Sequence, residues 1–225
     1  MTCISFRHLV PAALLAGAAF LMASETAHAQ DAPVGLSAGT ILVRVRALDV
    51  APLDSSSSIS TIGGTVHVTN QFAPEIDGSY FFTDHISVEA IAASTRHVLQ
   101  ARDTALGVID VGSTYVLPPA ITLQYHFFPK SRWSPYIGAG ADVSFFYDES
   151  RGSPVVTKLD VRTAAGPVIE AGVDYNISGH WFLNADVKQI FETPDANIDT
   201  SLGINLKAKV ALNPLVAGLG VGYAF

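Results

Sequence analysis

Residues 215–225 at the C-terminus read LVAGLGVGYAF, and they alternate between two kinds of side chain. The odd positions are all apolar and mostly bulky, while the even positions from 218 to 224 hold only glycine and alanine. A period of two residues predicts a β-strand whose side chains point to opposite faces. One face of this strand is therefore apolar, and the other leaves room for side chains from neighbouring strands.

The composition narrows what such a strand can belong to. The chain has 225 residues, of which 49% are hydrophobic and 15% charged, and its mean hydropathy is +0.34. After the N-terminal segment, no stretch approaches the roughly 18 uninterrupted apolar residues of a membrane-spanning helix. The chain must therefore bury a large core or face lipid through strands. Its formal net charge of −7 argues against a nucleic-acid partner, because binding nucleic acid needs a basic face.

The N-terminus has the pattern of a secretory signal peptide. Arg7 precedes an apolar run, and a small-x-small cleavage site ends at Ala29. We therefore expect residues 1–29 to be removed and residues 30–225 to form the mature protein as a single domain. The only cysteine, Cys3, leaves with the signal, so the mature protein has no thiol for disulfides or catalysis.

Strand-like alternation recurs along the rest of the chain. Eight segments carry it, at residues 38–50, 70–82, 86–96, 118–128, 135–147, 164–177, 181–192 and 206–225. The breaks between them are alternately short (83–84, 129–133, 178–179) and long and polar (51–69, 97–117, 148–163, 193–205). This pattern predicts an all-β fold, an eight-stranded antiparallel up-and-down transmembrane β-barrel with short periplasmic turns and long extracellular loops. Both termini then lie on the periplasmic side.

Aromatic residues support this topology because they gather at strand ends. The group beside the short turns and the C-terminus comprises Tyr80, Phe82, Phe127, Trp133, Tyr136, Tyr175, Trp181, Tyr223 and Phe225. A smaller group at the opposite ends comprises Phe72, Tyr115, Phe145, Tyr147 and Phe191. Aromatics favour strands in general, but their position at the ends favours the girdles of a membrane–water interface.

A soluble, lipocalin-like barrel is the main alternative for the fold, because it would show the same alternation with its apolar face inside. Three features favour the membrane barrel. The apolar face is almost free of charge on every strand, the strands lack hydrophilic outward positions between the aromatic ends, and the loops alternate in length. We therefore place the apolar face against lipid and the protein in the bacterial outer membrane.

Several longer stretches resemble the OmpW family of outer-membrane proteins. They include VGSTYVLPPAITLQYHFFP, SPYIGAGADVSFFYDE, EAGVDYNISGHWFLNADVK and NPLVAGLGVGYAF. The resemblance covers about residues 38–225 and implies an eight-stranded barrel with a narrow, largely apolar channel for small hydrophobic molecules. It also implies that the C-terminal Phe225 is read by the barrel-insertion machinery. The chain departs from the family at Leu215, usually Trp, and at Ala224, often basic.

The register of the strands divides the lumen into two levels. We define the apolar cup as the residues expected to line the extracellular half of the channel: Leu48, Ile91, Ala93, Ala120, Phe146, Val168, Ile190 and Val216. We define the charged floor as the charged residues expected in the periplasmic half: Arg44, Arg46, Glu75, Asp77, Glu89, Asp142, Glu170, Asp174, Asp186 and Lys188. An eight-stranded barrel is only wide enough for side chains to fill it. The floor is therefore expected to be a packed ion-pair network, with carboxylates in excess.

These two levels suggest different roles. The floor either only stabilises the barrel or takes a direct part in transport. The cup is a concave apolar surface of the kind that binds apolar molecules. The function expected is an outer-membrane channel that passes or binds small hydrophobic molecules, with outer-membrane lipid as its surroundings.

Other classes of function have weaker support in the sequence. A lipid-modifying barrel enzyme needs Ser and His together near the outer leaflet, whereas His126 is expected near a periplasmic turn with no serine at equal height. No pair of histidines has metal-ligand spacing, and no phosphate-binding motif is present, so neither a metal nor a cofactor is expected. A structural, adhesive, or phage- or colicin-receptor barrel without transport stays open, as does the oligomeric state.

Overall fold

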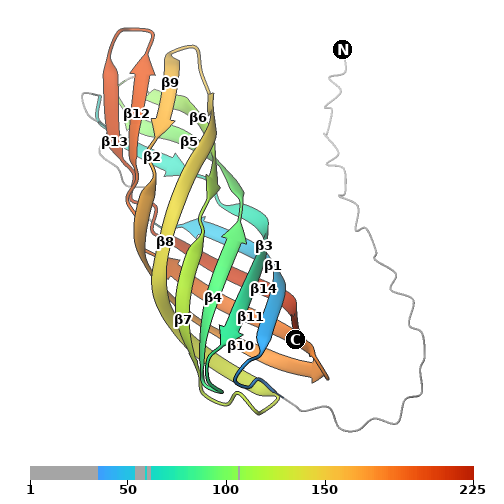
Figure 1. The fold of residues 1–225 in the computed structure, drawn as a ribbon. Helices are drawn as coiled ribbons and strands as arrows, with labels where there is room; N and C mark the ends of the chain where they lie inside the picture. The colour runs from blue at the N-terminus through green and yellow to red at the C-terminus, as the bar shows by residue number, and fades with distance from the viewer. Residues whose placement is uncertain (1–34, 54–58, 60–61, 106) are drawn as a thin grey trace, which may run out of the picture. The chain divides into compact units, whose positions relative to one another are not determined.

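The computed structural model describes residues 35–53, 59, 62–105 and 107–225 (Figure 1). The expected signal peptide, residues 1–29, lies outside these residues. Within the described ranges, no helix is long and apolar enough to cross a membrane.

Eight long strands close into an antiparallel barrel. They are β1 (Ile41–Pro52), β3 (Gln71–Phe81), β4 (Ile86–Ala93), β7 (Ala120–His126), β8 (Trp133–Arg151), β10 (Ala164–Ser178), β11 (Trp181–Ile190) and β14 (Pro214–Ala224). Each pairs with the next along the chain, and β14 pairs with β1 to close the ring. All eight predicted segments overlap these strands, so the predicted fold class is confirmed.

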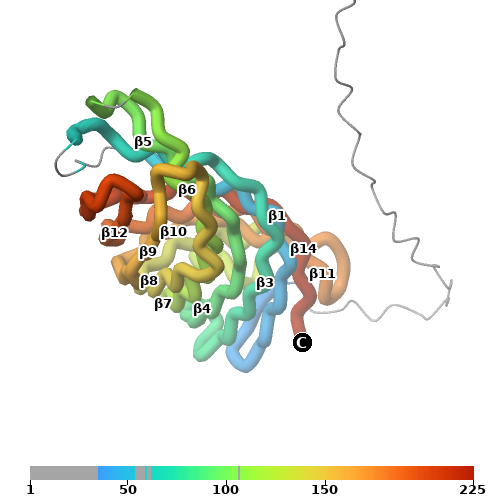
Figure 2. Tube along the Cα trace, turned by 90° about the horizontal axis from the view of Figure 1, so that it is seen from above, coloured from blue at the N-terminus to red at the C-terminus, as the bar shows by residue number. Residues whose placement is uncertain are grey.

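Six shorter strands continue the structure beyond the barrel. They are β2 (Thr65–Val68), β5 (Thr95–Thr104), β6 (Gly107–Leu117), β9 (Val156–Val161), β12 (Asp195–Thr200) and β13 (Asn205–Lys209). β6 pairs with the upper part of β8, so β8 belongs to both parts (Figures 1 and 2). We call these six strands the extension. Strands β2, β6, β9, β12 and most of β5 lie in the long segments that were predicted as polar loops, whereas β13 lies almost entirely in the predicted strand segment 206–225.

The extension forms strands because it has an apolar core of its own. Val66, Leu99 and Ile198 are among the buried residues of this core, and they come from three different segments. Alternation in these segments buries one face against the other segments and leaves the polar face in water.

The last predicted strand, 206–225, is in fact two strands. β13 pairs with β12 in the extension, and β14 begins only at Pro214 and pairs with β1 and β11. Asn213 between them has a φ of 32°, in the left-handed region that breaks a strand. Pro214 cannot donate a ladder hydrogen bond, so it suits the first position of a strand.

The barrel has its apolar side outside. Leu219 is 68% exposed, whereas Arg44 and Arg46 on the neighbouring strand are buried in the lumen. Aromatic pairs such as Tyr223 and Phe225 pack edge-to-face at the periplasmic rim. The exposed residues between the rims are aliphatic and uncharged, as a lipid-facing surface requires.

The glycines of β14 leave room for the two arginines of β1. Gly222 is the cross-strand neighbour of Arg44, and Gly220 that of Arg46. A Cβ atom at Gly222 would lie 2.7 Å from the Cγ of Arg44, and one at Gly220 would lie 2.6 Å from the Cγ of Arg46. The bare face of the C-terminal strand is thus filled by side chains from the first strand.

Two periplasmic turns end in a histidine that contacts the end of a neighbouring strand. The Nδ1 atom of His85 lies 2.7 Å from the carbonyl oxygen of His126, and that of His180 lies 2.7 Å from the carbonyl oxygen of Ala224. Each ring also stacks on the tyrosine that precedes its carbonyl partner. The same local contact therefore occurs twice around the periplasmic rim.

Candidate functional site

The periplasmic half of the lumen is organised around Arg44 on β1. Its guanidinium group contacts Asp77 at 2.7 Å, Glu89 at 2.9 Å and Asp174 at 3.2 Å, and it donates a hydrogen bond to Ser79 at 2.7 Å. All of these side chains are buried. Guanidinium suits this position because its donors form a rigid fork that can serve several carboxylates at once.

Arg46 repeats this arrangement one step further from the periplasm. Its guanidinium group lies 2.5 Å from Glu75, 2.9 Å from Asp77, 2.7 Å from Glu89 and 3.2 Å from Asp186. Because Asp77 and Glu89 contact both arginines, the two clusters form one network.

Lys188 on β11 connects the network to the opposite wall. Its ammonium group contacts Asp186 and lies 3.4 Å from both Glu89 and Glu170. Glu170 also accepts a hydrogen bond from Thr122 at 2.6 Å. We call these linked residues the charged network: Arg44, Arg46, Glu75, Asp77, Glu89, Glu170, Asp174, Asp186 and Lys188. Strands β1, β3, β4, β10 and β11 are thereby joined across the lumen.

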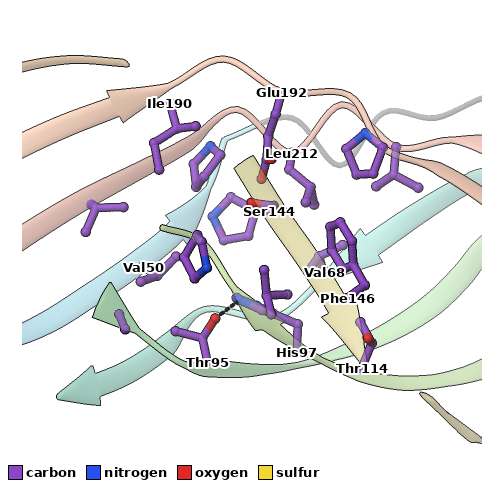
Figure 3. A pocket seen from close by; sticks show the side chains of 18 of the residues that line it. Val50, Val68, Thr95, His97, Thr114, Ser144, Phe146, Ile190, Glu192 and Leu212 are labelled. Carbon is purple, nitrogen blue, oxygen red and sulfur yellow. Dashed lines mark hydrogen bonds between the residues drawn. The ribbon is translucent and has the colours of Figure 1, made fainter. Parts of the chain in front are cut away.

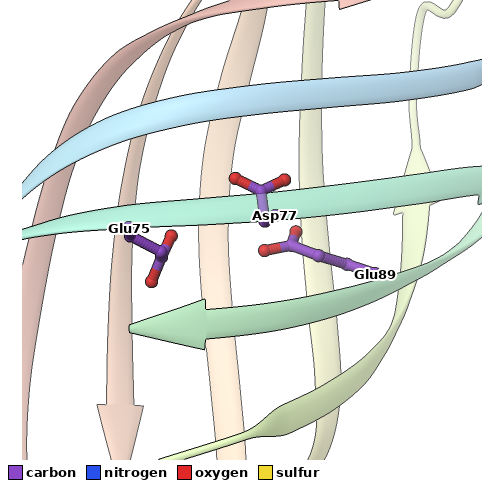
Figure 4. A group of neighbouring side chains, drawn as sticks. All are labelled: Glu75, Asp77 and Glu89. Atoms are coloured by element: carbon purple, nitrogen blue, oxygen red, sulfur yellow. The ribbon is translucent and has the colours of Figure 1, made fainter. Parts of the chain in front are cut away.

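Three acids of the network, Glu75, Asp77 and Glu89, have carboxylate oxygens within 4.8 Å of one another (Figure 4). Such a group has the dimensions of a metal site. In this structure, however, the guanidinium groups of Arg44 and Arg46 contact all three acids. The cluster is therefore accounted for by ion pairing within the protein.

Asp142 was assigned to the charged floor, but the structure places it apart from the network. It is the cross-strand neighbour of Ala120, which belongs to the level of the apolar cup. Its Oδ1 atom accepts a hydrogen bond from Ser144 at 3.0 Å. The assignment failed because the register sets Asp142 higher on β8 than Gly138, the residue that faces Glu170.

Below the network, an apolar cluster fills the periplasmic end of the lumen. We call it the periplasmic plug; its residues are Leu36, Leu42, Phe81, Phe182 and Ala224, all buried. The plug and the network together leave the lower lumen packed with side chains, as expected for a barrel of this size.

His126 lies between the plug and the network, and it is completely buried. Its Nδ1 atom is 3.1 Å from the hydroxyl of Ser134, and its Nε2 atom is 3.2 Å from that of Ser87. The expectation that no serine shares its height was therefore wrong. It failed because the periplasmic turns bring the ends of β4 and β8 beside the end of β7.

Above the network lies a lumen pocket with about 1000 Å³ of space not filled by atoms, including its mouth (Figure 3). All eight residues of the apolar cup line it, and they come from strands all around the barrel. At the base of the pocket, Glu75 and Lys188 of the charged network reach its wall. The pocket is thus an apolar space above a charged base.

Sequence reasoning missed the part of the pocket that the extension supplies. Val68 from β2, Leu99 from β5 and Val161 from β9 also line it. The alternation in these segments could have revealed Val68 and Val161, since each is flanked by polar residues, whereas Leu99 follows another apolar residue, Val98. They were overlooked because the segments were taken for loops.

Polar residues also line the pocket, among them His97 on β5. Its Nδ1 atom lies 2.9 Å from the carbonyl oxygen of Thr69, and its Nε2 atom 3.0 Å from the hydroxyl of Thr95 (Figure 3). Burial lowers the pKa of His97, because the extension shields the ring from water. Both ring nitrogens therefore have partners while the ring is neutral.

A closed barrel with an uncharged aliphatic exterior, aromatic rims and a charged lumen defines the class of outer-membrane β-barrel proteins. Within this class, the chain belongs to the OmpW family, whose model matches residues 37–225. The predicted family and the predicted location in the bacterial outer membrane are thereby confirmed.

Known relatives support this assignment over most of the chain. The uncharacterized outer-membrane protein y4mB of Sinorhizobium fredii is 34% identical, over 97% of each chain. Outer membrane protein W of Vibrio cholerae is 33% identical, over 83% of this chain and 89% of its own. The crystal structure of the outer membrane protein OprG from Pseudomonas aeruginosa matches with a TM-score of 0.79 at 27% identity, covering 85% of this chain and 98% of OprG.

Proposed function

We propose that this barrel binds small hydrophobic molecules in the lumen pocket and passes them across the outer membrane. The observation that carries the proposal is the lining of the pocket, in which side chains such as Phe146, Ile91 and Ile190 converge from three strands. Each Å² of apolar surface that a solute buries there contributes roughly 25 cal/mol to its binding. Polar nutrients gain nothing from contact with these apolar side chains, so this part of the pocket favours apolar solutes.

The charged network and the periplasmic plug act in this proposal as a closed base. Arg44 and Arg46 contact acids on several strands, and the plug fills the space beneath them. An apolar solute that moved straight down would have to displace buried ion pairs, which is costly because each charge would lose its partners. The base therefore stabilises the barrel and directs the solute elsewhere.

The barrel wall beside the pocket offers a route above this base. Strand pairing between β4 and β7 ends at Ile91 and Ala120, and pairing between β5 and β6 resumes at Thr95 and Val116. Pro118, which lines the pocket, lies in this interval and has no N–H group to donate across it. We infer that a solute leaves the pocket through this part of the wall.

We infer a channel rather than a lipid-modifying enzyme. His126 has two serine neighbours, but its ring is 0% exposed and lies beneath the charged network. A lipid substrate has no path to it, whereas a lipid-modifying enzyme needs its nucleophile in contact with the substrate.

Two further partners follow from the outer surface. The exposed aliphatic belt is expected to contact outer-membrane lipid. Phe225 is 71% exposed at the periplasmic end of β14, where the barrel-insertion machinery can reach it. We propose that this residue is the main contact for insertion.

The experiment that tests transport adds charge to the pocket. Phe146→Arg combined with Val50→Arg places two guanidinium groups among the apolar lining, away from lipid. Uptake of an apolar fluorescent probe into proteoliposomes should fall to background, while heat-modifiable mobility on gels stays normal. The matched control is Val108→Arg with Leu202→Arg, which adds the same charge at exposed positions on β6 and in the turn between β12 and β13. Unchanged uptake by the pocket variant would exclude the pocket as the path.

A further inference from the structure

A carboxyl group in the wall of the lumen pocket, that of Glu192, and a second one beside it, that of Asp142, have no cationic partner among the described residues. Asp142 is 0% exposed and Glu192 is 5% exposed. The Oδ2 atom of Asp142 and the Oε2 atom of Glu192 accept no hydrogen bond from the part of the chain that the structure describes. Within that same part, no Lys, Arg or His nitrogen lies within 4.0 Å of either group. Buried acids without partners are expensive, so a ligand that supplies the missing donors would be favoured.

The strand register brings these two acids together across a glycine. Asp142 on β8 is the cross-strand neighbour of Gly166 on β10. A Cβ atom at Gly166 would lie 3.4 Å from the Cβ of Glu192, which follows β11. The same Cβ atom would clash with the backbone carbonyl of Phe191, so the absence of a side chain at Gly166 lets the segment that carries Glu192 lie close to β10.

Ser144 contacts both acids and also lines the lumen pocket. Its hydroxyl donates a hydrogen bond to Asp142 at 3.0 Å and also neighbours the carboxyl of Glu192. Both Ser144 and Glu192 line the lumen pocket, and Figure 3 shows the Glu192 side chain directed toward Ser144. We call Asp142, Ser144 and Glu192 the acidic subsite.

The charge around the acidic subsite favours a cation. In the charged network beneath it, the acids outnumber the bases, so the described residues give the lumen a negative potential. A cation in the pocket would gain from this potential and from the two carboxyl groups beside it. An anion would be repelled by both.

We propose that the acidic subsite binds the ammonium group of an alkylamine whose hydrocarbon chain lies in the apolar cup. A primary ammonium group has three donors, which match the free oxygens of Asp142 and Glu192 and the hydroxyl oxygen of Ser144. The apolar wall next to the subsite gives the alkyl chain its place. This inference rests on the proposed function and names a class of solute within it.

Three ligands with the same hydrocarbon chain and different polar groups show how much the polar group contributes to binding. The protein, in lipid nanodiscs at neutral pH, is titrated with octylamine, octanol and octanoate, and amide NMR shifts of Ser144 and Gly166 report binding at the subsite. Octylamine should bind about tenfold more tightly than octanol, since hydrogen bonds to charged groups are stronger than neutral ones. Octanoate should bind most weakly.

A pair of near-isosteric substitutions tests the two acids directly. Asp142→Asn with Glu192→Gln should weaken octylamine binding about tenfold, to the level of octanol, and leave octanol binding unchanged. The matched control is Asp148→Asn with Asp195→Asn, which removes two exposed acids outside the pocket and should change neither. Because all variants are compared through their octanol binding, a misfolded protein is recognised at once.

The possible outcomes distinguish this inference from the proposed function. Equal binding of octylamine and octanol to the unmodified protein would overturn the acidic subsite while leaving an apolar pocket intact. Failure of all three ligands to bind would overturn the proposed function itself. If sodium or calcium chloride alone shifts the Ser144 and Gly166 signals and abolishes octylamine binding, the site takes an inorganic cation and the alkylamine proposal fails.

Discussion

Arg44 and Gly222 face each other across the seam between β1 and β14, and the absent side chain of Gly222 makes room for the stem of the arginine. This contact sets the position of a guanidinium group that reaches acids on β3, β4 and β10.

Gly222→Val should therefore destabilise the barrel by about 1–3 kcal/mol, the usual cost of forcing extra volume into a packed interior. Ala217→Val on the same strand adds similar volume on the lipid side and should have little effect. Urea-induced unfolding in lipid bilayers measures both. Equal losses for the two variants would show that the glycine is not needed for packing.

Ala141 and Ser144 lie on opposite faces of β8. Ala141→Arg should lower the free energy of unfolding by roughly 2–4 kcal/mol, because it places a charge in lipid. Ser144→Arg places the same charge in the lumen beside two acids, so its folding yield into bilayers should be much higher. The reverse order of yields would mean that the register of β8 is wrong.

Arg46→Met should destabilise the protein by about 3–5 kcal/mol, since it leaves several buried carboxylates without their partner. Adding Glu75→Gln should recover part of this loss, because one of the unpaired acids is then neutral. Equilibrium unfolding of both variants provides the test. If the Arg46→Met variant alone were as stable as the unmodified protein, a stabilising role for the network would be contradicted.

The buried ring of His97 should make the extension sensitive to acid. Burial lowers the pKa of His97 in the folded state, whereas an unfolded histidine titrates at about 6.5. Below that pH the unfolded state binds more protons, so the stability of the extension falls as the pH drops. Amide exchange at β5 should therefore be faster at pH 5 than at pH 7.5, after correction for intrinsic rates. His97→Gln should remove the contribution of this residue; an unchanged difference would assign it to another group.

The expected signal peptide gives a simple test on the intact cell. Mass spectrometry of the membrane-inserted protein should find Gln30 or its neighbour as the first residue. A thiol reagent should not label the protein, because Cys3 is the only cysteine of the chain. Labelling of Cys3 would overturn the predicted cleavage.

The barrel could be predicted because lipid imposes one simple rule on it. A lipid-facing residue is apolar and its neighbour is not, so alternation alone places Leu219 outside and Arg44 inside. The extension follows the same rule for a different reason, the burial of its own core. Alternation cannot distinguish these two causes, and Val66 and Leu99 were therefore left in predicted loops.

The site could be predicted where the position of a residue along its strand gave its level in the barrel. The residues of the apolar cup have the right face and the right level, and the lumen pocket brings them together. Asp142 was placed too low because the stagger between β7 and β8 is a property of pairing and is invisible in one strand. Glu192 lies in the predicted segment 181–192 but was not assigned to the lumen. In the structure it follows the end of β11 and lines the lumen pocket together with Ser144.

The position of Arg44 and Arg46 on the first strand also affects the order of assembly. Arg44 pairs with Asp174, 130 residues further along the chain, and β1 meets β14 only when the ring closes. Contacts so distant in sequence form late in folding, because the loop between them must first be ordered. The acids of β10 and β11 are therefore synthesised, exported and paired into strands before the two guanidinium groups reach them. The ion pairs of Asp174 with Arg44 and of Asp186 with Arg46 are in this way coupled to closure, so that an incompletely closed barrel lacks them and is the less stable form.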